Sequence, residues 1–287
     1  MITNEGVLMN DIQNGNIDQD HLNNIKLIAL PVININKIDS QEVKESFKKI
    51  SNGFYNYCIF LSSNAVKIFF DMAKNEHDYE RIMDELNKMK LIVIGPKTKK
   101  ILQNYGFESK LGSSTTSIND KKYSSSEIIE FLENLEREYK TKYQKEIPKI
   151  LMPRSAESIR SSNYINRKFK YIILDQVFFY ETSENKNASN SENWKELLEL
   201  PNRNKKNFLI FTSPSTVRSF FKIMHTQFSQ VSDHKSEREV IQALNVNMVI
   251  SIGPKTSLEL KKNKIDFTES SEYTINGALG LILRLIK

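Results

Sequence analysis

One stretch of this chain occurs twice, and it limits the possible folds more than any other feature. Each copy is an apolar run that ends in Gly-Pro-Lys-Thr, at Leu91–Thr98 and at Met248–Thr256. Such a run predicts a strand that is buried on both faces. Glycine followed by proline predicts a tight exit from the strand into the first turn of a helix. The free backbone N–H groups at the start of that helix would suit an anionic ligand.

The duplication extends beyond these two stretches. An apolar strand and a serine-containing turn precede each copy, at Tyr57–Val66 and at Phe208–Val217. An apolar stripe with helical spacing follows each turn, and the two stripes are Val66, Phe69, Phe70 and Ala73, and Val217, Phe220, Phe221 and Met224. The sequence therefore predicts two α/β domains that face each other across a cleft, each a parallel sheet flanked by helices.

Composition argues against several classes of protein. The 287 residues leave room for two ordinary domains. No apolar run has the length that a membrane span needs, and residues 1–20 lack the features of a signal peptide. The net charge of +6 favours a polyanionic partner only mildly. Because no Lys/Arg stripe with interleaved aromatic residues occurs, we expect neither nucleic acid nor membrane as a partner.

The usual catalytic signatures are missing from the sequence. The single cysteine, Cys58, lies in an apolar strand, which indicates a buried thiol rather than a nucleophile. The histidines lack the spacing of metal ligands, and they are His21, His77, His225 and His234. No Walker A loop, G-x-G-x-x-G loop or G-x-S-x-G elbow occurs. We therefore expect an activity that uses no metal and no nucleotide.

Hydroxyl groups at strand ends are the main candidates for a site. They belong to Ser62, Ser63, Ser213 and Ser215 in the turns and to Thr98 and Thr256 in the repeats. Ligands of open α/β sheets bind beyond the carboxyl ends of the strands, and both copies place hydroxyls there. Helix capping is an equally reasonable role for these residues. Lys97 and Lys255 either attract a carboxylate or remain solvated.

At this point the motifs resemble those of the uroporphyrinogen-III synthase family. Phe211–Ser215 is similar to the family's Phe-Thr/Ser-Ser-Pro turn, and Ile252–Thr256 is similar to its Ile-Gly-Pro-Thr-Thr motif. Ile150–Arg154 resembles the strand before the family's domain return, and Phe179–Thr182 resembles its Val-Tyr-x-Thr motif. The resemblance covers the chain from about Ile25 to the C-terminus. The order of the motifs and their duplication make it specific.

The resemblance implies two α/β domains that are joined by a two-stranded β-ladder, with the substrate in the cleft. We expect one domain at residues 1–35 and 181–287, and the other at residues 40–176. The implied reaction closes hydroxymethylbilane to uroporphyrinogen III, inverts ring D and releases water without a cofactor. A monomeric lyase of haem biosynthesis is expected, in the cytoplasm, or in a plastid or mitochondrion if a presequence has been removed.

The resemblance also implies residues of the site. Tyr180 matches the tyrosine of Val-Tyr-x-Thr and is our candidate for the catalytic proton donor, unless its hydroxyl is only packed. The motifs also match at Thr256, Ser213, Ser63 and Thr98, and the neighbouring Ser215, Gly253, Lys255 and Lys97 complete the expected substrate contacts. The substrate carries eight carboxylates, which suit a site of backbone N–H groups, hydroxyls and lysines.

Three features depart from the family pattern. Lys255 stands where the family often has a threonine, and Lys264 replaces a helix-ending glycine. We expect Asn263 to take the left-handed conformation in place of that glycine. The residues before Ile25 show no clear first strand. Two alternatives therefore stay open: a non-catalytic two-lobed binder of polycarboxylates or phosphates, and a degenerate family member.

Overall fold

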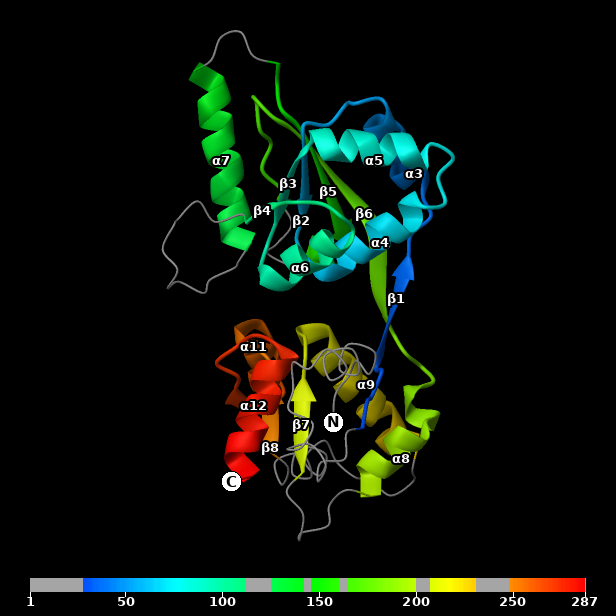
Figure 1. Ribbon diagram of the computed structural model, residues 1–287. Helices are drawn as coiled ribbons and strands as arrows, with labels where there is room; N and C mark the ends of the chain where they lie inside the picture. Colours follow the sequence, from blue (N-terminus) through cyan, green and yellow to red (C-terminus); the bar gives the residue numbers. More distant parts are fainter. Residues whose placement is uncertain are drawn as a thin grey trace. The chain divides into compact units, whose positions relative to one another are not determined.

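Two compact units make up the chain (Figure 1). The first unit comprises Met1–Asn34 and Ser183–Lys287, and the second unit comprises Ile35–Thr182. The computed structural model describes residues 28–111, 125–141, 146–160, 165–199, 207–230 and 248–286. Each unit contains a parallel sheet that is flanked by helices, and this confirms the predicted fold class.

A six-stranded sheet forms the centre of the second unit. Its order is β1-β6-β5-β2-β3-β4, and the four pairs from β6 to β4 are parallel. The strands are β1 (Ile33–Lys37), β2 (Tyr57–Phe60), β3 (Lys90–Val93), β4 (Lys110–Leu111), β5 (Lys149–Ser155) and β6 (Ile173–Glu184). The chain builds outward from β2 to β4 and then returns to the other side of β2 with β5. The strand order therefore reverses between β2 and β5.

Helices cover both faces of this sheet (Figure 1). The helices are α3 (Gln41–Ser51), α4 (Ser63–Ala73), α5 (Tyr79–Lys88), α6 (Pro96–Asn104) and α7 (Ser125–Thr141), with a 3₁₀ turn η1 (Ala156–Arg160). One core lies between the sheet and α3 to α6, and it contains Phe47, Phe69 and Leu102. The other lies beneath α7 and contains Ile128 and Leu132.

The chain passes between the two units in β1 and again in β6. These strands are neighbours in the sheet. Ile38 N donates to Phe179 O at 2.9 Å, and Asn185 N donates to Val32 O at 3.0 Å. The residue numbers change in opposite directions along the two strands, so the pairing is antiparallel. The second unit is thus an insertion between two pieces of the first.

A three-stranded parallel sheet, β7-β8-β9, forms the centre of the first unit. Its elements are α8 (Glu192–Glu199), β7 (Phe208–Phe211), α9 (Pro214–Gln230), β8 (Met248–Ser251), α11 (Pro254–Lys262), β9 (Thr268–Glu269) and α12 (Ile275–Ile286), with η2 (Ala188–Asn190). One core joins α8, α9 and α11 to the sheet and includes Ile28, Leu30 and Val32. A smaller core lies between the sheet and α12.

The repeat forms the predicted element pairs in both units. Each Gly-Pro-Lys-Thr joins a strand to a helix that begins at its proline, Pro96 in α6 and Pro254 in α11. The residues of both apolar stripes are buried, as predicted, and each large one contributes roughly 1.5–3 kcal/mol. Cys58 is also buried.

Three phenylalanines repeat the same packing in each unit. The ring centroids of Phe60, Phe69 and Phe70 are 5.3, 5.4 and 6.4 Å apart. Those of the corresponding residues in the first unit are 5.3, 5.5 and 6.5 Å apart, and these residues are Phe211, Phe220 and Phe221. The duplication therefore preserves the core geometry as well as the order of the elements.

The end of α11 corrects one expectation. Lys264 has a φ of 57°, whereas Asn263, which we expected to be left-handed, has a φ of −88°. Asn263 occupies the C-cap, and its side chain donates to Glu259 O at 2.9 Å. The left-handed residue follows the C-cap, where a glycine is usual. Lys264 itself thus adopts the strained left-handed conformation.

Candidate active site

A tyrosine and a serine meet at the carboxyl end of the second unit's sheet. The Tyr180 hydroxyl lies 3.0 Å from Ser62 Oγ. Ser62 follows β2 and caps α4, because its Oγ accepts the backbone N–H of Ala65 at 3.1 Å. Ser63, the predicted contact, is the next residue and the first of α4. The two hydroxyls carry two hydrogens and use one between them, so one O–H remains for a third oxygen.

A bulge in β6 sets the direction of the Tyr180 side chain. In the pairing with β5, the register shifts by one residue between Phe178 and Tyr180, so Phe179 is extra. A regular strand would place Tyr180 on the same face as Phe178, because side chains alternate. Instead, Tyr180 packs in the same core as Phe179 and α4. Bulges redirect side chains in this way beside functional sites.

The Tyr180 phenol is neutral at pH 7. Tyr180 is only 7% exposed, and this burial raises the pKa of its phenol above the ordinary value of 10.0. The hydrogen bond with Ser62 acts against that shift. The nearby carboxylate of Glu157 raises the pKa further, and the guanidinium of Arg154 lowers it. The phenol therefore carries a proton that it could donate.

Hydrogen bonds hold both of these charged side chains in position. Glu157 accepts the backbone N–H of Thr182 with one carboxylate oxygen and the Ser155 hydroxyl with the other. Arg154 is 2% exposed, and its Nη1 donates to the side chain of Gln176. The guanidinium of Arg154 and the carboxylate of Glu157 thus lie near Tyr180. Residues of β5, η1 and β6 determine their positions.

The start of α6 has no side-chain cap. Gly95 occupies the N-cap position and offers no side-chain hydrogen bond to the helix. In the first turn, Lys97 is exposed and Thr98 is 5% exposed. Thr98 therefore does not cap the helix, which was the alternative to ligand contact. The positive end of the α6 dipole lies at the carboxyl end of β3.

The serine turn of the first unit forms a local cap. Thr216 N donates to Ser213 Oγ at 3.2 Å, and Thr216 Oγ1 donates to Ser213 O at 2.7 Å. Ser215 Oγ accepts Arg218 Nη2 at 3.2 Å. Ser213 thus has the capping role that the sequence left open. It differs from Ser62, whose hydroxyl also contacts a tyrosine from another strand.

A network of buried hydroxyls supports the second Gly-Pro-Lys-Thr. Ser251 Oγ donates to Gly253 O at 3.0 Å, and Ser257 Oγ lies 2.9 Å from Ser251 Oγ. Ser257 also bonds the carboxylate of Glu269 at the end of β9. These bonds connect the loop, the first turn of α11 and the neighbouring strand. These hydrogen bonds therefore fix the position of the loop on the sheet.

The other predicted residues of the first unit lie at the start of α11. Gly253 is the N-cap and provides no side-chain hydrogen bond. Lys255 is exposed, whereas Thr256 is 3% exposed. Thr256 consequently does not cap α11, just as Thr98 does not cap α6. Two helix starts with the same four residues lie at the carboxyl ends of the two sheets.

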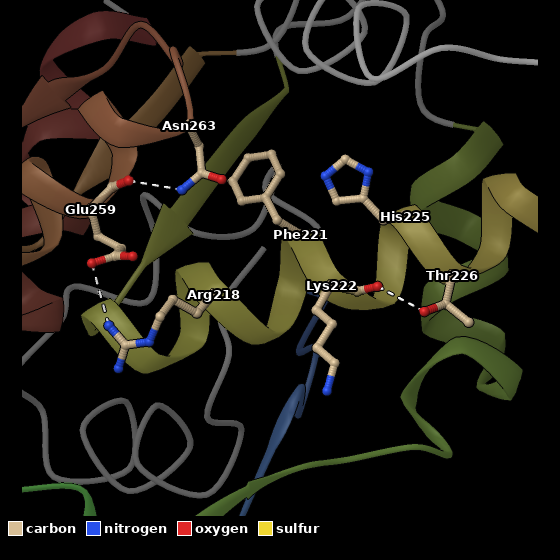
Figure 2. A pocket seen from close by; sticks show the side chains of 7 residues that line it. All are labelled: Arg218, Phe221, Lys222, His225, Thr226, Glu259 and Asn263. Atoms are coloured by element: carbon tan, nitrogen blue, oxygen red, sulfur yellow. Dashed lines mark hydrogen bonds and ion pairs between the residues drawn. The ribbon is translucent and has the colours of Figure 1, made fainter. Parts of the chain in front are cut away.

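An open pocket of about 660 Å³ lies between α9 and α11 (Figure 2). Its lining residues are Arg218, Phe221, Lys222, His225, Thr226, Glu259 and Asn263. Arg218 pairs with Glu259 at 3.3 Å, and Lys222 pairs with Glu184 at 2.8 Å. The lining begins in the second turn of α9 and extends toward the helix C-termini. The pocket is therefore separate from the strand ends, and carboxylates already neutralise its arginine and lysine.

The described part of the chain lacks a metal-binding cluster and a membrane-spanning helix. Within it, no three His, Cys, Asp or Glu side chains lie together as metal ligands could. None of its helices has both the length and the apolar character that crossing a bilayer requires. His21 and His234 lie outside the described residues, and His77 lies beside Asp78 at 3.2 Å.

Two residues of this site were missing from the predicted set, Arg154 and Glu157. Ser62 was a candidate hydroxyl but was not among the expected substrate contacts, and its place in the turn after the strand was the signal for a cap. Arg154 ends an apolar run, where a charged residue is unusual enough to suggest a role. For Glu157 the sequence offered no signal, because its partners come from β5 and β6.

Comparison with known proteins identifies the family. A family model described as uroporphyrinogen-III synthase HemD matches residues 23–280. The chain belongs to the uroporphyrinogen-III synthase family. A protein of Methanocaldococcus jannaschii, described as a candidate uroporphyrinogen-III synthase, is 27% identical over 234 residues, which are 80% of each chain. The crystal structure of uroporphyrinogen-III synthetase from Helicobacter pylori 26695 has a similar fold, with a TM-score of 0.52, 17% identity and coverage of 90% of this chain and 92% of that one.

Family membership confirms the function that the motifs predicted. The chain is thus a lyase of tetrapyrrole biosynthesis that acts on hydroxymethylbilane. The match begins at residue 23 and extends over both units. None of the comparisons favours the non-catalytic binder.

Proposed function

We propose that this protein closes hydroxymethylbilane with Tyr180 as the proton donor, hydrogen-bonded to Ser62. The contact of 3.0 Å between their hydroxyls is the observation that carries the proposal. Open α/β sheets bind ligands beyond the carboxyl ends of their strands, where the strand order reverses. The order reverses between β2 and β5, and Ser62 lies two residues after the end of β2. The pair is thus at the position that this architecture favours for chemistry.

Ring closure begins with the loss of the substrate's hydroxyl group. The carbon–oxygen bond breaks, the oxygen takes a proton from the Tyr180–Ser62 pair, and water leaves. The pyrrole nitrogen supplies the electron pair that forms an electrophilic azafulvene. Ring D then attacks this carbon through the ring position that already carries the bridge to ring C. That bridge bond breaks and re-forms at the free position of ring D, which inverts the ring, and the proton released from that position restores the phenol. General-acid assistance of this kind contributes roughly 10²–10⁴ in rate.

Arg154 supports the proton transfer electrostatically. Burial makes the Tyr180 phenol a weaker acid, whereas the guanidinium lowers its pKa. As the proton leaves, the phenolate gains negative charge, and the fixed cation stabilises that charge without reorganisation. Glu157 acts in the opposite sense on the pKa. The two charges together favour a phenol that is protonated at rest and still able to donate.

The two helix starts are proposed to bind the carboxylates of the substrate. Helix N-termini carry partial positive charge and free N–H groups, which stabilise anions. Lys97 and Thr98 at α6, and Lys255 and Thr256 at α11, would add an ammonium and a hydroxyl to each. Gly253 precedes the second start and has no side chain that would cap its N–H groups. Eight carboxylates distributed over several such contacts need no dominant ion pair.

Product analysis tests the proposed function. Hydroxymethylbilane closes without catalysis to the type I isomer, so type III product reports the enzyme directly. We expect the purified protein to give type III product, separated from type I by chromatography. Type I product alone, from folded protein with fresh substrate, would contradict the proposal.

The proposal also includes a monomer in the cytoplasm, or in a plastid or mitochondrion after loss of a presequence. One chain carries both copies of the repeat and every residue of the Tyr180 site, so the proposed site needs no second chain. Light scattering on the protein as it elutes from a size-exclusion column should give a mass near 33.4 kDa. A mass of twice that value would overturn the monomer.

A further inference from the structure

A second tyrosine lies at the carboxyl end of the first unit's sheet. Tyr273 is in the loop between β9 and α12, and it is 50% exposed. The loop follows the end of β9, which is next to β8 in the sheet. Tyr273 therefore lies at the same edge as the loop that opens α11. No role had been expected for it from the sequence.

The position of this ring explains a glycine that the backbone does not require. Gly253 has a φ of 170°, which is an extended conformation that any residue adopts. A Cβ at this position would lie 3.0 Å from Cδ1 and 3.3 Å from Cγ of Tyr273. Such contacts are too close for an undisturbed ring. Glycine thus lets the ring pack directly on the backbone, and a larger residue would displace the ring.

Hydrogen bonds hold the loop on both sides of Tyr273. Ser270 Oγ donates to Glu272 O at 2.6 Å, and Thr274 N donates to the same oxygen at 2.7 Å. Thr274 in turn caps α12, because its Oγ1 accepts Gly277 N at 3.0 Å. The ring therefore has a fixed support and one face against Gly253. Half of its surface remains open to solvent.

We propose that Tyr273 is a substrate-contact residue whose exposed ring packs against a pyrrole of the linear tetrapyrrole. This inference rests on the proposed function and names the part of the substrate that this edge recognises. Large aromatic side chains are normally buried, and an exposed ring on a hydrogen-bonded loop is suited to contact a flat ligand. Pyrrole rings are flat and electron-rich, and their carboxylates would extend toward the exposed Lys255.

Replacing the ring tests the contact. Tyr273→Ala should raise KM for hydroxymethylbilane roughly tenfold, in line with the loss of one stacked ring, and leave kcat nearly unchanged. Tyr273→Phe keeps the ring and should behave like the parent. Tyr171→Ala is the matched control, because Tyr171 is a partly exposed tyrosine just before β6, at the opposite edge of the other sheet. A parental KM in folded Tyr273→Ala would overturn the proposal.

A double-mutant cycle separates this role from simple packing. Gly253→Ala fits the backbone but displaces the ring, so it should raise KM in the parent. In the Tyr273→Ala background the same change should add almost nothing, since the two act through one contact. Fully additive effects on KM would show that Gly253 acts on the substrate by itself, and the proposed role of the ring would be wrong.

Binding of uroporphyrin III distinguishes this inference from the proposed function. Fluorescence titration measures it without turnover. Weaker binding by Tyr273→Ala than by the parent supports the contact, even if the parent forms no type III product and the proposed function fails. An active parent whose KM and uroporphyrin affinity are both unchanged in Tyr273→Ala overturns the contact and leaves the proposed function intact.

Discussion

The two Gly-Pro-Lys-Thr copies have the same residues and different backbones. Gly95 has φ 80° and ψ 152°, in a region that almost only glycine occupies, whereas Gly253 has φ 170° and ψ 178°, which is extended. Both glycines precede a helix that begins at proline. The shared residues therefore determine the junction between strand and helix. The path of the loop before the helix depends on its surroundings.

Those surroundings differ in chemistry at aligned positions. Beneath the second copy, Ser251 and Ser257 form a buried network with Glu269. The aligned residues of the first copy are Val93 and Lys99. A hydroxyl network holds one loop, while the other relies on glycine's conformational range. In the second unit, the backbone conformation requires glycine at Gly95. In the first unit, the absence of a side chain at Gly253 leaves space for the Tyr273 ring.

The serine turns diverge in the same manner. Ser62 caps a helix and also contacts Tyr180, while Ser213 bonds only within its own turn among the described contacts. Duplication supplied two equivalent sheet edges, and a bulged β6 brought a tyrosine to only one of these serines. We therefore assign proton transfer to the second unit's edge and substrate contact to the first unit's edge.

The largest expected effect comes from removing the phenol. Tyr180→Phe should lower kcat roughly 10²–10⁴-fold with little change in KM, because general-acid assistance acts in the transition state. Single-turnover kinetics with separation of type III product measures it, with Tyr171→Phe as the control. A folded Tyr180→Phe that works at the parental rate would place leaving-group departure on other groups.

The two glycines should respond differently to alanine. Gly95→Ala forces a side chain into a glycine-only conformation and should lower the free energy of unfolding by about 1–3 kcal/mol. Gly253→Ala should change it by less than about 0.5 kcal/mol, because the half-exposed Tyr273 ring can move. Urea denaturation of both variants makes the comparison. Equal losses would mean that the two loops do not differ as described.

Alanine at the two serines separates a cap from a catalytic contact. Ser62→Ala and Ser213→Ala should each cost about 1 kcal/mol of stability, because each removes a helix cap. Only Ser62→Ala should also reduce kcat, by roughly two- to tenfold, since Tyr180 loses its hydrogen-bond partner. Thermal melts and turnover should be measured on the same preparations. An equal loss of kcat in both variants would remove the distinction between the edges.

The smallest expected effects belong to the exposed lysines. Lys255→Ala and Lys97→Ala should each raise KM about fivefold or less, because exposed ion pairs contribute little. The effect should shrink further in high salt, which screens such charges. Steady-state assays at two ionic strengths measure both. Loss of all substrate binding in either variant would reveal a concentrated carboxylate site at that helix start.

Much of the scaffold could be predicted from the sequence. Apolar runs and stripes with a clear period define buried strands and helices. In each unit, the core on one face of the sheet contains the expected phenylalanines. The repeat also gave the correct starts of α6 and α11. The local sequence pattern was sufficient for these elements, because the free energy gained by burying a continuous apolar face exceeds that of other local conformations.

The contacts of the candidate site could not be predicted from the local sequence pattern. The shift of register at Phe179 changes the face of Tyr180, and alternation alone predicts the opposite face. Choosing between Ser62 and Ser63 needed the partner from β6. The left-handed residue after α11 was misplaced by one position, from Lys264 to Asn263, because cap geometry varies by a residue. The first two of these depend on a neighbour that is distant in sequence, whereas the third is a local property of the helix end.

The insertion of one unit into the other has a consequence for synthesis on the ribosome. The apolar segment with Ile28, Leu30 and Val32 emerges early, yet its core partners, such as Trp194 and Phe211, lie beyond the inserted unit. At a translation rate of roughly 5–20 residues per second, that segment waits on the order of ten seconds for its sheet. The inserted unit can complete its own core during this interval. The nascent chain thus presents an unpaired hydrophobic segment, which makes it a natural client for chaperones.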